Sequence, residues 1–166
     1  MKKIIVIGCP GSGKSTFSKK LHQITQIPLY HLDMLYWKPD KTTVDKSEFS
    51  KRVSEILPQR HWIIDGNYIS TMEARMKACD TVVFLDFQAD VCLSGIEERK
   101  GKARSDIPWI ESDDFDVDFI NFIKNFAFDT RPQILDLLDK YHDKNVYILK
   151  SRNQADAFLL KCEFKA

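Results

Sequence analysis

The chain has 166 residues, and 43% of them are hydrophobic, which fits one compact domain with a buried core. It carries 25 lysine and arginine residues against 24 aspartate and glutamate residues, so no large net charge favours non-specific binding to nucleic acid or to a membrane surface. The four cysteines are scattered without a CxxC pair, which argues against a disulfide framework or a zinc knuckle and favours a reducing cytoplasm.

Short apolar runs alternate with helix-like or irregular segments along the chain. We predict strands over 3–7, 28–32, 62–64, 81–85 and 146–149. We predict helices over 14–23, 46–57, 72–77, 91–100, 115–125, 133–141 and 154–162, with a capping box at 70–73 and a helix start at Thr130 before Pro132. The alternation predicts an α/β domain whose mostly parallel sheet is covered by helices. The first apolar run is too short for a signal peptide or a membrane span, so we expect no membrane partner.

A phosphate-binding motif follows the first predicted strand. The run Gly8-Cys-Pro-Gly-Ser-Gly-Lys-Ser15 satisfies GxxxxGK[ST] and leads into a helical pattern, which is the context that the motif requires. Its glycines let backbone N–H groups and a helix N-terminus surround phosphate oxygens, while Lys14 adds a mobile positive charge and the Ser15 hydroxyl is placed to bind Mg²⁺. The alternative is a structural glycine-rich turn. We predict that ATP is bound by Gly8, Pro10, Gly11, Ser12, Gly13, Lys14, Ser15 and Thr16.

Three aspartates end predicted strands, where the ligand crevice of an open α/β sheet lies. Asp33 could accept the proton of a substrate hydroxyl or cap the next helix. Asp65 precedes a glycine, as a carboxylate that orients Mg²⁺ through its water shell would, although an Asp-Gly turn is the alternative. Asp86 leads straight into the next helical segment, which favours capping or packing. His31 alternates to the strand face opposite Asp33, so we expect a structural role for it.

A basic segment follows the fourth predicted strand and its helix. Residues 99–106 (RKGKARSD) carry four positive charges around a glycine, which suits a mobile lid that closes over phosphates, although a solvated turn is the alternative. We place this lid at about 99–114 within a single domain over 1–166 and predict that Arg99 and Arg104 are catalytic. Arg75 and Arg131 are further candidates for substrate binding, unless they are ordinary surface arginines.

Aromatic residues recur at helical spacing in the segment after the lid. The set is Phe115, Phe119, Phe122 and Phe126, with Ile120 and Ile123 beside them. A base-stacking surface would show this pattern, but a stripe that packs into the core shows it too. We expect the buried stripe.

The P-loop, the Asp65-Gly66 pair and the basic lid together resemble the nucleoside monophosphate kinase superfamily, which includes adenylate and shikimate kinases. The resemblance implies a P-loop NTPase fold with three α/β/α layers, a five-stranded parallel sheet in the order 2-3-1-4-5 and a short lid. Adenylate kinases follow Asp-Gly with Phe-Pro-Arg, whereas this chain has Asn67-Tyr68 and its next arginine is Arg75. Shikimate kinases use a second-strand aspartate on substrate hydroxyls, which Asp33 matches, but their glycine pair after the third strand is absent.

A closer resemblance extends over nearly the whole chain. The runs at 30–33 (YHLD), 37–39 (WKP), 64–68 (IDGNY), 84–86 (FLD) and 99–104 (RKGKAR) resemble the bacterial topology modulation proteins. That family is related to adenylate kinases, and its name implies an effect on DNA topology without identifying a reaction. DNA is therefore a possible partner by family name only.

These observations favour a cytoplasmic kinase that transfers the γ-phosphoryl group of ATP, with Mg²⁺, to a small-molecule or nucleotide acceptor. The rival is an ATP-dependent regulatory or DNA-topology-modulating module, in which nucleotide binding closes the lid and changes a partner contact. The acceptor, the choice between ATP and GTP and the oligomeric state stay open. In the kinase hypothesis the acceptor is held between Asp33, Trp37, Asn67 and Tyr68, and the lid arginines neutralise the transition state.

Overall fold

The computed structural model describes residues 1–102, 104–109 and 116–164, and its centre is a five-stranded sheet. Neighbouring strands are all parallel and stand in the order β2-β3-β1-β4-β5, which confirms the predicted topology. Because the strands are parallel, their carboxyl ends meet at one edge of the sheet, where ligands bind in such folds. The strands are β1 Lys3–Gly8, β2 Leu29–His31, β3 Trp62–Asp65, β4 Thr81–Leu85 and β5 Asn145–Leu149.

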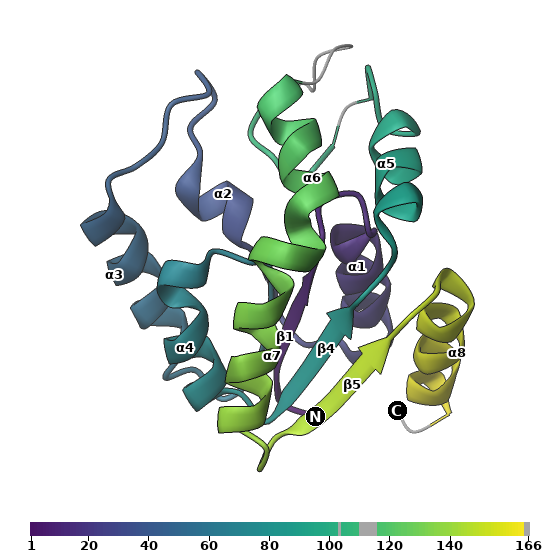
Figure 1. Cartoon of the computed structure of the whole chain (residues 1–166). Helices are drawn as coiled ribbons and strands as arrows, with labels where there is room; N and C mark the ends of the chain where they lie inside the picture. The colour runs from purple at the N-terminus through teal and green to yellow at the C-terminus, as the bar shows by residue number, and fades with distance from the viewer. Residues whose placement is uncertain (103, 110–115, 165–166) are drawn as a thin grey trace.

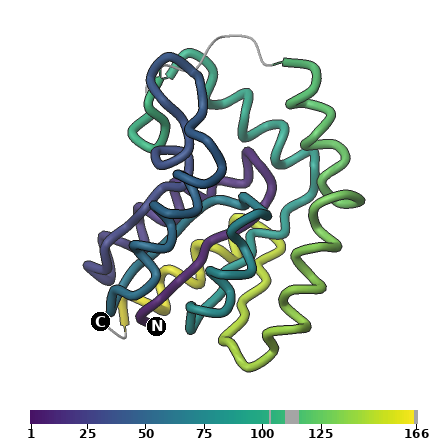
Figure 2. Tube along the Cα trace, turned by 90° about the vertical axis from the view of Figure 1, so that its left-hand side faces the viewer, coloured from purple at the N-terminus to yellow at the C-terminus, as the bar shows by residue number. Residues whose placement is uncertain are grey.

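Helices cover both faces of this sheet (Figure 1). On one face α1 packs against β1 and β3 and against α8, while α4, α6 and α7 lie on the opposite face, as the side view also shows (Figure 2). None of the helices within the described ranges is long and apolar enough to cross a membrane. The helices are α1 Lys14–Thr25, α2 Leu32–Tyr36, α3 Lys46–Ile56, α4 Ile69–Ala78, α5 Ala89–Glu97, α6 Val117–Asp129, α7 Arg131–Lys140 and α8 Arg152–Glu163.

The core lies on both sides of the three middle strands. Residues 4–7 of β1, the whole of β3 and the whole of β4 are buried, because helices cover them on both faces. A strand buried on both faces has no polar side to alternate with, so it appears in the sequence as a continuous apolar run. The edge strand β5 is largely exposed. The P-loop and the loop after β3 therefore start from the fully buried centre of the molecule.

Two predicted features differ from the structure, and a third agrees with it. The short helix α2 was not predicted, and it places Asp33 in a first helical turn instead of at the end of β2. The capping box at 70–73 is wrong, because α4 begins at Ile69 with Tyr68 as its N-cap residue. The helix start at Thr130 is confirmed, since Thr130 alone separates α6 from α7 and a proline lies in the first turn of α7.

The aromatic stripe of α6 is divided between the core and a cleft. Ile123 and Phe126 are buried, as predicted. Phe122 is 42% exposed, and it lines the cleft described below together with Phe119. Phe115 lies outside the described residues. The prediction of a buried stripe is therefore right for one part of this helix and wrong for the other.

Candidate functional site

The loop between β1 and α1 has the backbone geometry of an anion cradle. Gly11 and Gly13 have φ values of 83° and 85°, and a methyl group on Gly11 would lie 2.0 Å from the carbonyl oxygen of Cys92, so only glycine fits there. Gly13 is the N-cap residue of α1, whose first turn carries no acidic side chain and no side-chain cap. The buried Ser12 hydroxyl has no hydrogen-bond partner among the described residues. These free donors fit a phosphate group.

The Lys14 ammonium lies on the P-loop backbone. Its Nζ donates to the carbonyl oxygens of Gly8 and Cys9 at 2.9 and 3.0 Å. The Cys9 carbonyl also accepts the Ser12 N–H at 3.1 Å. Burial lowers the pKa of Lys14, because a buried ammonium loses its hydration. A half-buried cation whose hydrogen bonds go to neutral carbonyls is one that an arriving phosphate attracts strongly.

The P-loop opens into a cleft of about 1380 Å³ that contains most of the predicted site. Its walls come from the P-loop, α2, the loop after β3, the lid segment and α8. The predicted residues that line it are those at 10–16 together with Asp33, Trp37, Asn67, Tyr68, Arg99 and Arg104. Four others, all within the described ranges, are not among the lining residues: Gly8, Asp65, Arg75 and Arg131.

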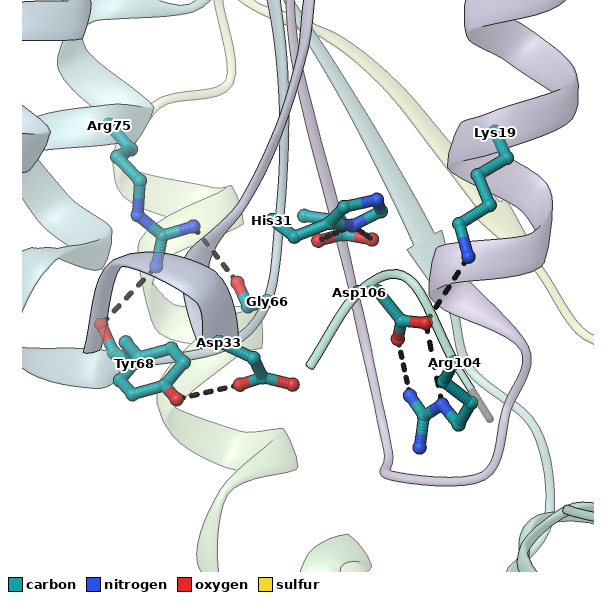
Figure 3. Close-up of polar contacts among 9 residues, drawn as sticks. Lys19, His31, Asp33, Gly66, Tyr68, Arg75, Arg104 and Asp106 are labelled. Carbon is teal, nitrogen blue, oxygen red and sulfur yellow. Dashed lines mark hydrogen bonds and ion pairs between the residues drawn. The ribbon is translucent and has the colours of Figure 1, made fainter. Parts of the chain in front are cut away.

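Asp33 and Tyr68 form a hydrogen-bonded pair on the wall opposite α1. The Tyr68 hydroxyl donates to Asp33 Oδ1 at 2.6 Å (Figure 3). Burial raises the pKa of Asp33, and the hydrogen bond from Tyr68 and the charge of Lys14 oppose that shift. A carboxylate with a raised pKa at the wall of a cleft suits a general base, because it is a stronger proton acceptor than an ordinary aspartate.

Asp65 is paired with His31 beneath the cleft. The two residues lie side by side in the register of β2 and β3, and the His31 Nδ1 lies 2.9 Å from each carboxylate oxygen of Asp65. Asp65 is only 4% exposed. His31 therefore orients Asp65 and not Asp33. This agrees with the prediction that His31 points to the strand face opposite Asp33 and has a structural role. The role of Asp65 in orienting Mg²⁺ stays a prediction, and any such role acts from below the cleft.

The Asn67 side chain joins the loop after β3 to the P-loop. Its Nδ2 donates to the carbonyl oxygen of Gly8 at 2.8 Å, and its Oδ1 accepts the Gly8 N–H at 3.0 Å. The amide thus satisfies both backbone groups of Gly8, as a neighbouring strand would. Although Asn67 lines the cleft, these bonds direct its polar atoms to the P-loop backbone. Its geometry is that of a positioning residue, whereas the sequence predicts a substrate contact for it.

Arg75 is a correction to the predicted site. It is fully buried in α4, and its guanidinium donates to the carbonyl oxygens of Gly66 at 3.0 Å and of Tyr68 at 3.2 Å (Figure 3). It also donates to the carbonyl oxygen of Asn67. Burial lowers the pKa of Arg75 to about 9, which still leaves it protonated at neutral pH. Arg75 is therefore neither a surface arginine nor a cleft residue. It holds a loop in which Tyr68 has a positive φ of 38°.

Arg131 is a second correction. Its Nε and Nη2 donate to the two carboxylate oxygens of Asp86 at 2.8 and 3.0 Å, and Lys150 pairs with the same carboxylate. Desolvation would raise the pKa of Asp86, but the hydrogen bonds from both cations outweigh it and the pKa is lowered. Asp86 thus has the packing role that its position in the sequence favours. Arg131 joins α7 to the end of β4, outside the cleft.

A lid carboxylate that the sequence analysis did not single out contacts the P-loop side of the cleft. Asp106 is 2% exposed; Arg104 donates to both of its oxygens, and Lys19 of α1 reaches it at 3.2 Å (Figure 3). Desolvation would raise the pKa of Asp106, but Arg104, the Ser15 hydroxyl and Lys19 hold it well below its usual range. Part of the predicted lid, 103 and 110–114, lies outside the described residues.

Aromatic side chains close the end of the cleft next to Asp33. The rings of Trp37 and Trp109 lie 5.3 Å apart, and that of Tyr68 lies 5.0 Å from Tyr36. Figure 2 shows the loop after α2 beside the lid segment near residue 105, at the same end of the molecule. Trp109 was not predicted, because nothing in the sequence links it to Trp37, 72 residues earlier (109 − 37).

The residues of the cleft fit a nucleotide that brings Mg²⁺ with it. The Ser15 hydroxyl and the carboxylates of Asp33 and Asp106 line the cleft, and such oxygens are the ligands that Mg²⁺ prefers. Within the described part of the chain, His, Cys, Asp and Glu side chains form no group of three that could hold a metal by themselves.

No protein-family model and no curated protein matches the chain. Solved structures do match. A shikimate kinase from Acinetobacter baumannii in complex with shikimate is 14% identical, with 97% of this chain and 90% of that chain covered and a TM-score of 0.62. A shikimate kinase from Bacteroides thetaiotaomicron is 18% identical, with 98% of this chain and 96% of that chain covered and a TM-score of 0.55. A gluconokinase from Sinorhizobium meliloti 1021 is 14% identical, with 99% of this chain and 94% of that chain covered and a TM-score of 0.56. At these identities the likeness shows the fold, which is that of P-loop kinases.

Proposed function

We propose that this chain is an ATP-dependent kinase that phosphorylates a hydroxyl group of a small acceptor. The observation that carries the proposal is that Lys14 and Asp33 both line one cleft and lie near enough for the charge of Lys14 to act on the Asp33 carboxylate, so a phosphate-binding cation and a candidate base share the same space. The fold supports it, because the three solved structures named above are kinases. Fold alone does not define an activity, which is why the proposal rests on the site.

The phosphate end of the cleft has the residues that a triphosphate needs. The backbone N–H groups of the P-loop and the N-terminus of α1 bind phosphate oxygens, and Lys14 moves from its carbonyl partners to the β- and γ-phosphates. Arg99 and Arg104 line the same cleft from the lid and neutralise charge on the transferred group. Mg²⁺, held by Ser15 and phosphate oxygens, supplies further charge neutralisation when it is bound.

Asp33 acts at the acceptor end. Its carboxylate accepts the proton of the acceptor hydroxyl as that oxygen bonds to the γ-phosphorus, and the bridging bond between the β- and γ-phosphates breaks to release ADP. Tyr68 holds one carboxylate oxygen at 2.6 Å and so orients the other toward the substrate. The raised pKa of Asp33 makes it a better proton acceptor. Both residues are thus matched to proton transfer at a bound hydroxyl.

Several finer statements belong to this proposal and not to the fold. ATP as donor, Mg²⁺ as cofactor, a cytoplasmic location and a single domain over 1–166 follow from the sequence analysis. Membership of the topology modulation proteins stays a prediction from the runs that resemble them. The regulatory module remains the rival, because Asp106 links the lid to the P-loop residue Ser15, as a nucleotide-driven lid would require.

Incubation with MgATP and a panel of nucleosides, nucleotides, sugars and small hydroxy acids tests the proposal. ADP release and product mass are followed for the native chain, for Lys14→Ala and for Asp33→Asn. A phosphorylated product that requires both residues, with ATP binding retained in Asp33→Asn, supports the kinase. ATP binding without a product from any acceptor contradicts the kinase and favours the regulatory module.

A further inference from the structure

One face of α5 lies directly on the P-loop, and Gly95 is at the point of contact. A methyl group on Gly95 would lie 2.1 Å from the carbonyl oxygen of Gly11, just as a methyl group on Gly11 would lie 2.0 Å from the carbonyl oxygen of Cys92. The thiol groups of Cys92 and Cys9 are hydrogen-bonded to each other beside this contact. The backbones of the helix and of the P-loop therefore pack against each other directly.

The backbone conformation at Gly95 does not itself require glycine. Gly95 lies inside a helix and has no positive φ, unlike Gly11 with its φ of 83°. Glycine inside a helix costs stability relative to alanine, because it loses more conformational freedom on folding. The close approach to the P-loop is therefore the structural reason for glycine at this position.

The same face of α5 leads to the first lid arginine. Cys92, Gly95 and Arg99 follow one another at spacings of three and four residues, which places them on one side of a helix. Arg99 lies just beyond Glu97, the last residue of α5, but its backbone N–H bonds to the carbonyl oxygen of Ile96 at 3.2 Å, so the chain keeps turning through it. The position of Arg99 thus depends on how closely α5 sits on the P-loop.

Arg99 also lies within electrostatic reach of the P-loop lysine. Both residues line the cleft, and the Arg99 guanidinium lies 5.9 Å from the centre of the Phe119 ring of α6. Burial is the main cause of the lowered pKa of Lys14, and the positive charge of Arg99 acts in the same direction. These two cations repel each other, and the phosphate groups of a bound nucleotide would offset that repulsion.

We infer that Gly95 is a positioning residue: its close approach to Gly11 sets the place of Arg99 at the γ-phosphate of bound ATP. The inference rests on the proposed function for ATP as the ligand and for the role of Arg99. A contact between a carbon atom and a carbonyl oxygen is ordinarily about 3.3 Å long, so a methyl group on Gly95 must move the two backbones apart by about 1 Å.

The helix end is the part that such a methyl group displaces. The P-loop follows the buried strand β1, and the Asn67 amide holds both backbone groups of Gly8, whereas α5 ends two residues after Gly95. Charge-assisted hydrogen bonds need distances of about 2.7–2.9 Å, so a shift of about 1 Å at Arg99 breaks its contact with the γ-phosphate.

Nucleotide binding supplies the measurement, because it does not require turnover. MgADP and the magnesium complex of a non-hydrolysable ATP analogue are titrated by calorimetry into the native chain, Gly95→Ala, Arg99→Met and the double variant. The ratio of the two dissociation constants reports on contacts to the γ-phosphate, since the ligands differ in that group. Ser94→Ala, which places the same residue at the neighbouring exposed position of α5, is the matched control.

We expect Gly95→Ala and Arg99→Met each to lower the preference for the ATP analogue by about tenfold, as the loss of one charge-assisted hydrogen bond would. The double variant should lose no more than Arg99→Met alone, because Gly95 acts through Arg99. Ser94→Ala should keep the native preference. Equal weakening of both nucleotides in Gly95→Ala would mean that the methyl group deforms the P-loop instead, and additive losses would mean a route other than Arg99. Either result overturns the inference.

A second variant tests the same link without adding bulk at the contact. Glu97→Gly loosens the last turn of α5 between Gly95 and Arg99, at an exposed position that does not line the cleft. It should lower the preference for the ATP analogue severalfold, while Glu97→Ala keeps it. A ratio that is the same in Glu97→Gly and Glu97→Ala contradicts the inference, whether or not Gly95→Ala folds.

This experiment fails separately from the kinase proposal. An ATP preference that depends on Gly95 and Arg99, without a product from any acceptor, keeps the inference and contradicts the kinase. A phosphorylated product that depends on Lys14, formed by a chain whose ATP preference is the same in Gly95→Ala as in the native protein, keeps the kinase and contradicts the inference.

Discussion

The two ends of the cleft are held in place by different kinds of interaction. At the phosphate end, Lys14 bonds to carbonyls five and six residues away, and the backbone turns at Gly11 and Gly13 complete the cradle. At the acceptor end, Tyr68 and Asp33 are 35 residues apart in the sequence, and Asn67 reaches Gly8 across 59 residues. The phosphate end is built from contacts between residues close in the sequence, while the acceptor end depends on the correct packing of segments that are far apart in the sequence. Substitutions should therefore disturb chemistry at the first end and structure at the second.

The largest effect is expected at the local end. Replacing Lys14 with Ala removes the cation from the γ-phosphate, and turnover should fall by about 100- to 1,000-fold, which is the usual loss for one electrostatic contact to a transition state. The fold should persist, because the glycine turns and α1 do not require this side chain. Steady-state kinetics and circular dichroism measure the two effects. Lys51→Ala, at an exposed position of α3, is the control, and equal turnover in the two variants would refute the assignment of the P-loop.

Arg75→Met should act on structure instead. It leaves the carbonyls of Gly66 and Asn67 without the donor that Arg75 provides, while the Tyr68 carbonyl keeps the Thr71 N–H. Each unpaired buried group costs free energy, so the free energy of unfolding should fall by about 2–4 kcal/mol. Urea unfolding measures it. Lys77→Met makes the same replacement of a cation on the exposed face of α4 and should change stability little. A variant as stable as the native chain would show that these bonds do not hold the acceptor end.

Lys14 and Arg75 also show which parts of the site the sequence predicts and which it cannot. The α/β class and the P-loop follow from local signals: apolar runs of strand length, glycines at fixed spacing and a helical pattern after them. The strand order 2-3-1-4-5 follows instead from the resemblance to the nucleoside monophosphate kinase superfamily. Arg75 and Arg131 carry no local signal of their partners, because a charged residue on a predicted helix looks the same whether it faces a cleft, a carboxylate or buried carbonyls. Asp106 and Trp109 were missed for the same reason, since their contacts with Lys19 and Trp37 are tertiary.

The contact between the lid and the P-loop tests whether the two ends communicate. The Asp106 carboxylate interacts with the side chains of Ser15, Lys19 and Arg104, which would otherwise be available to bind the phosphates of ATP. Asp106→Asn removes the competing charge, so ATP should bind up to about tenfold more tightly, as measured by calorimetry. Asp143→Asn, at an exposed position away from the cleft, is the control. Weaker binding in Asp106→Asn would mean that this carboxylate supports the bound state instead of competing with it.

The smallest effect concerns the pH dependence of turnover. Burial raises the pKa of Asp33, so the acidic limb of the rate profile should lie at higher pH than the pKa of an ordinary aspartate. The Tyr68 hydrogen bond lowers this pKa, and Tyr68→Phe should therefore move the limb to still higher pH. Rate profiles of the two proteins give the comparison. A limb that stays in place in Tyr68→Phe would mean that Asp33 is not the titrating group.

The same raised pKa has a consequence for stability. The folded protein holds the proton of Asp33 more tightly than the unfolded chain, so this group's contribution to stability is complete at low pH and is lost as the pH rises through the folded-state pKa. At neutral pH the ionised carboxylate is thus a cost that the fold tolerates. We expect Asp33→Asn to melt at a higher temperature than the native chain near pH 7, and a lower melting temperature would contradict the direction of the shift.

The Lys14 side chain lies on carbonyls that can do without it. The Gly8 carbonyl keeps the Asn67 amide as a donor, and the Cys9 carbonyl keeps the Ser12 N–H. When the ammonium swings to an incoming phosphate, neither oxygen is left unpaired, so the departure carries little of the usual penalty for breaking a buried hydrogen bond. Lys14 can therefore leave its resting position at little cost in free energy, and the Asn67 amide, 59 residues from Gly8, contributes to this by keeping the Gly8 carbonyl hydrogen-bonded.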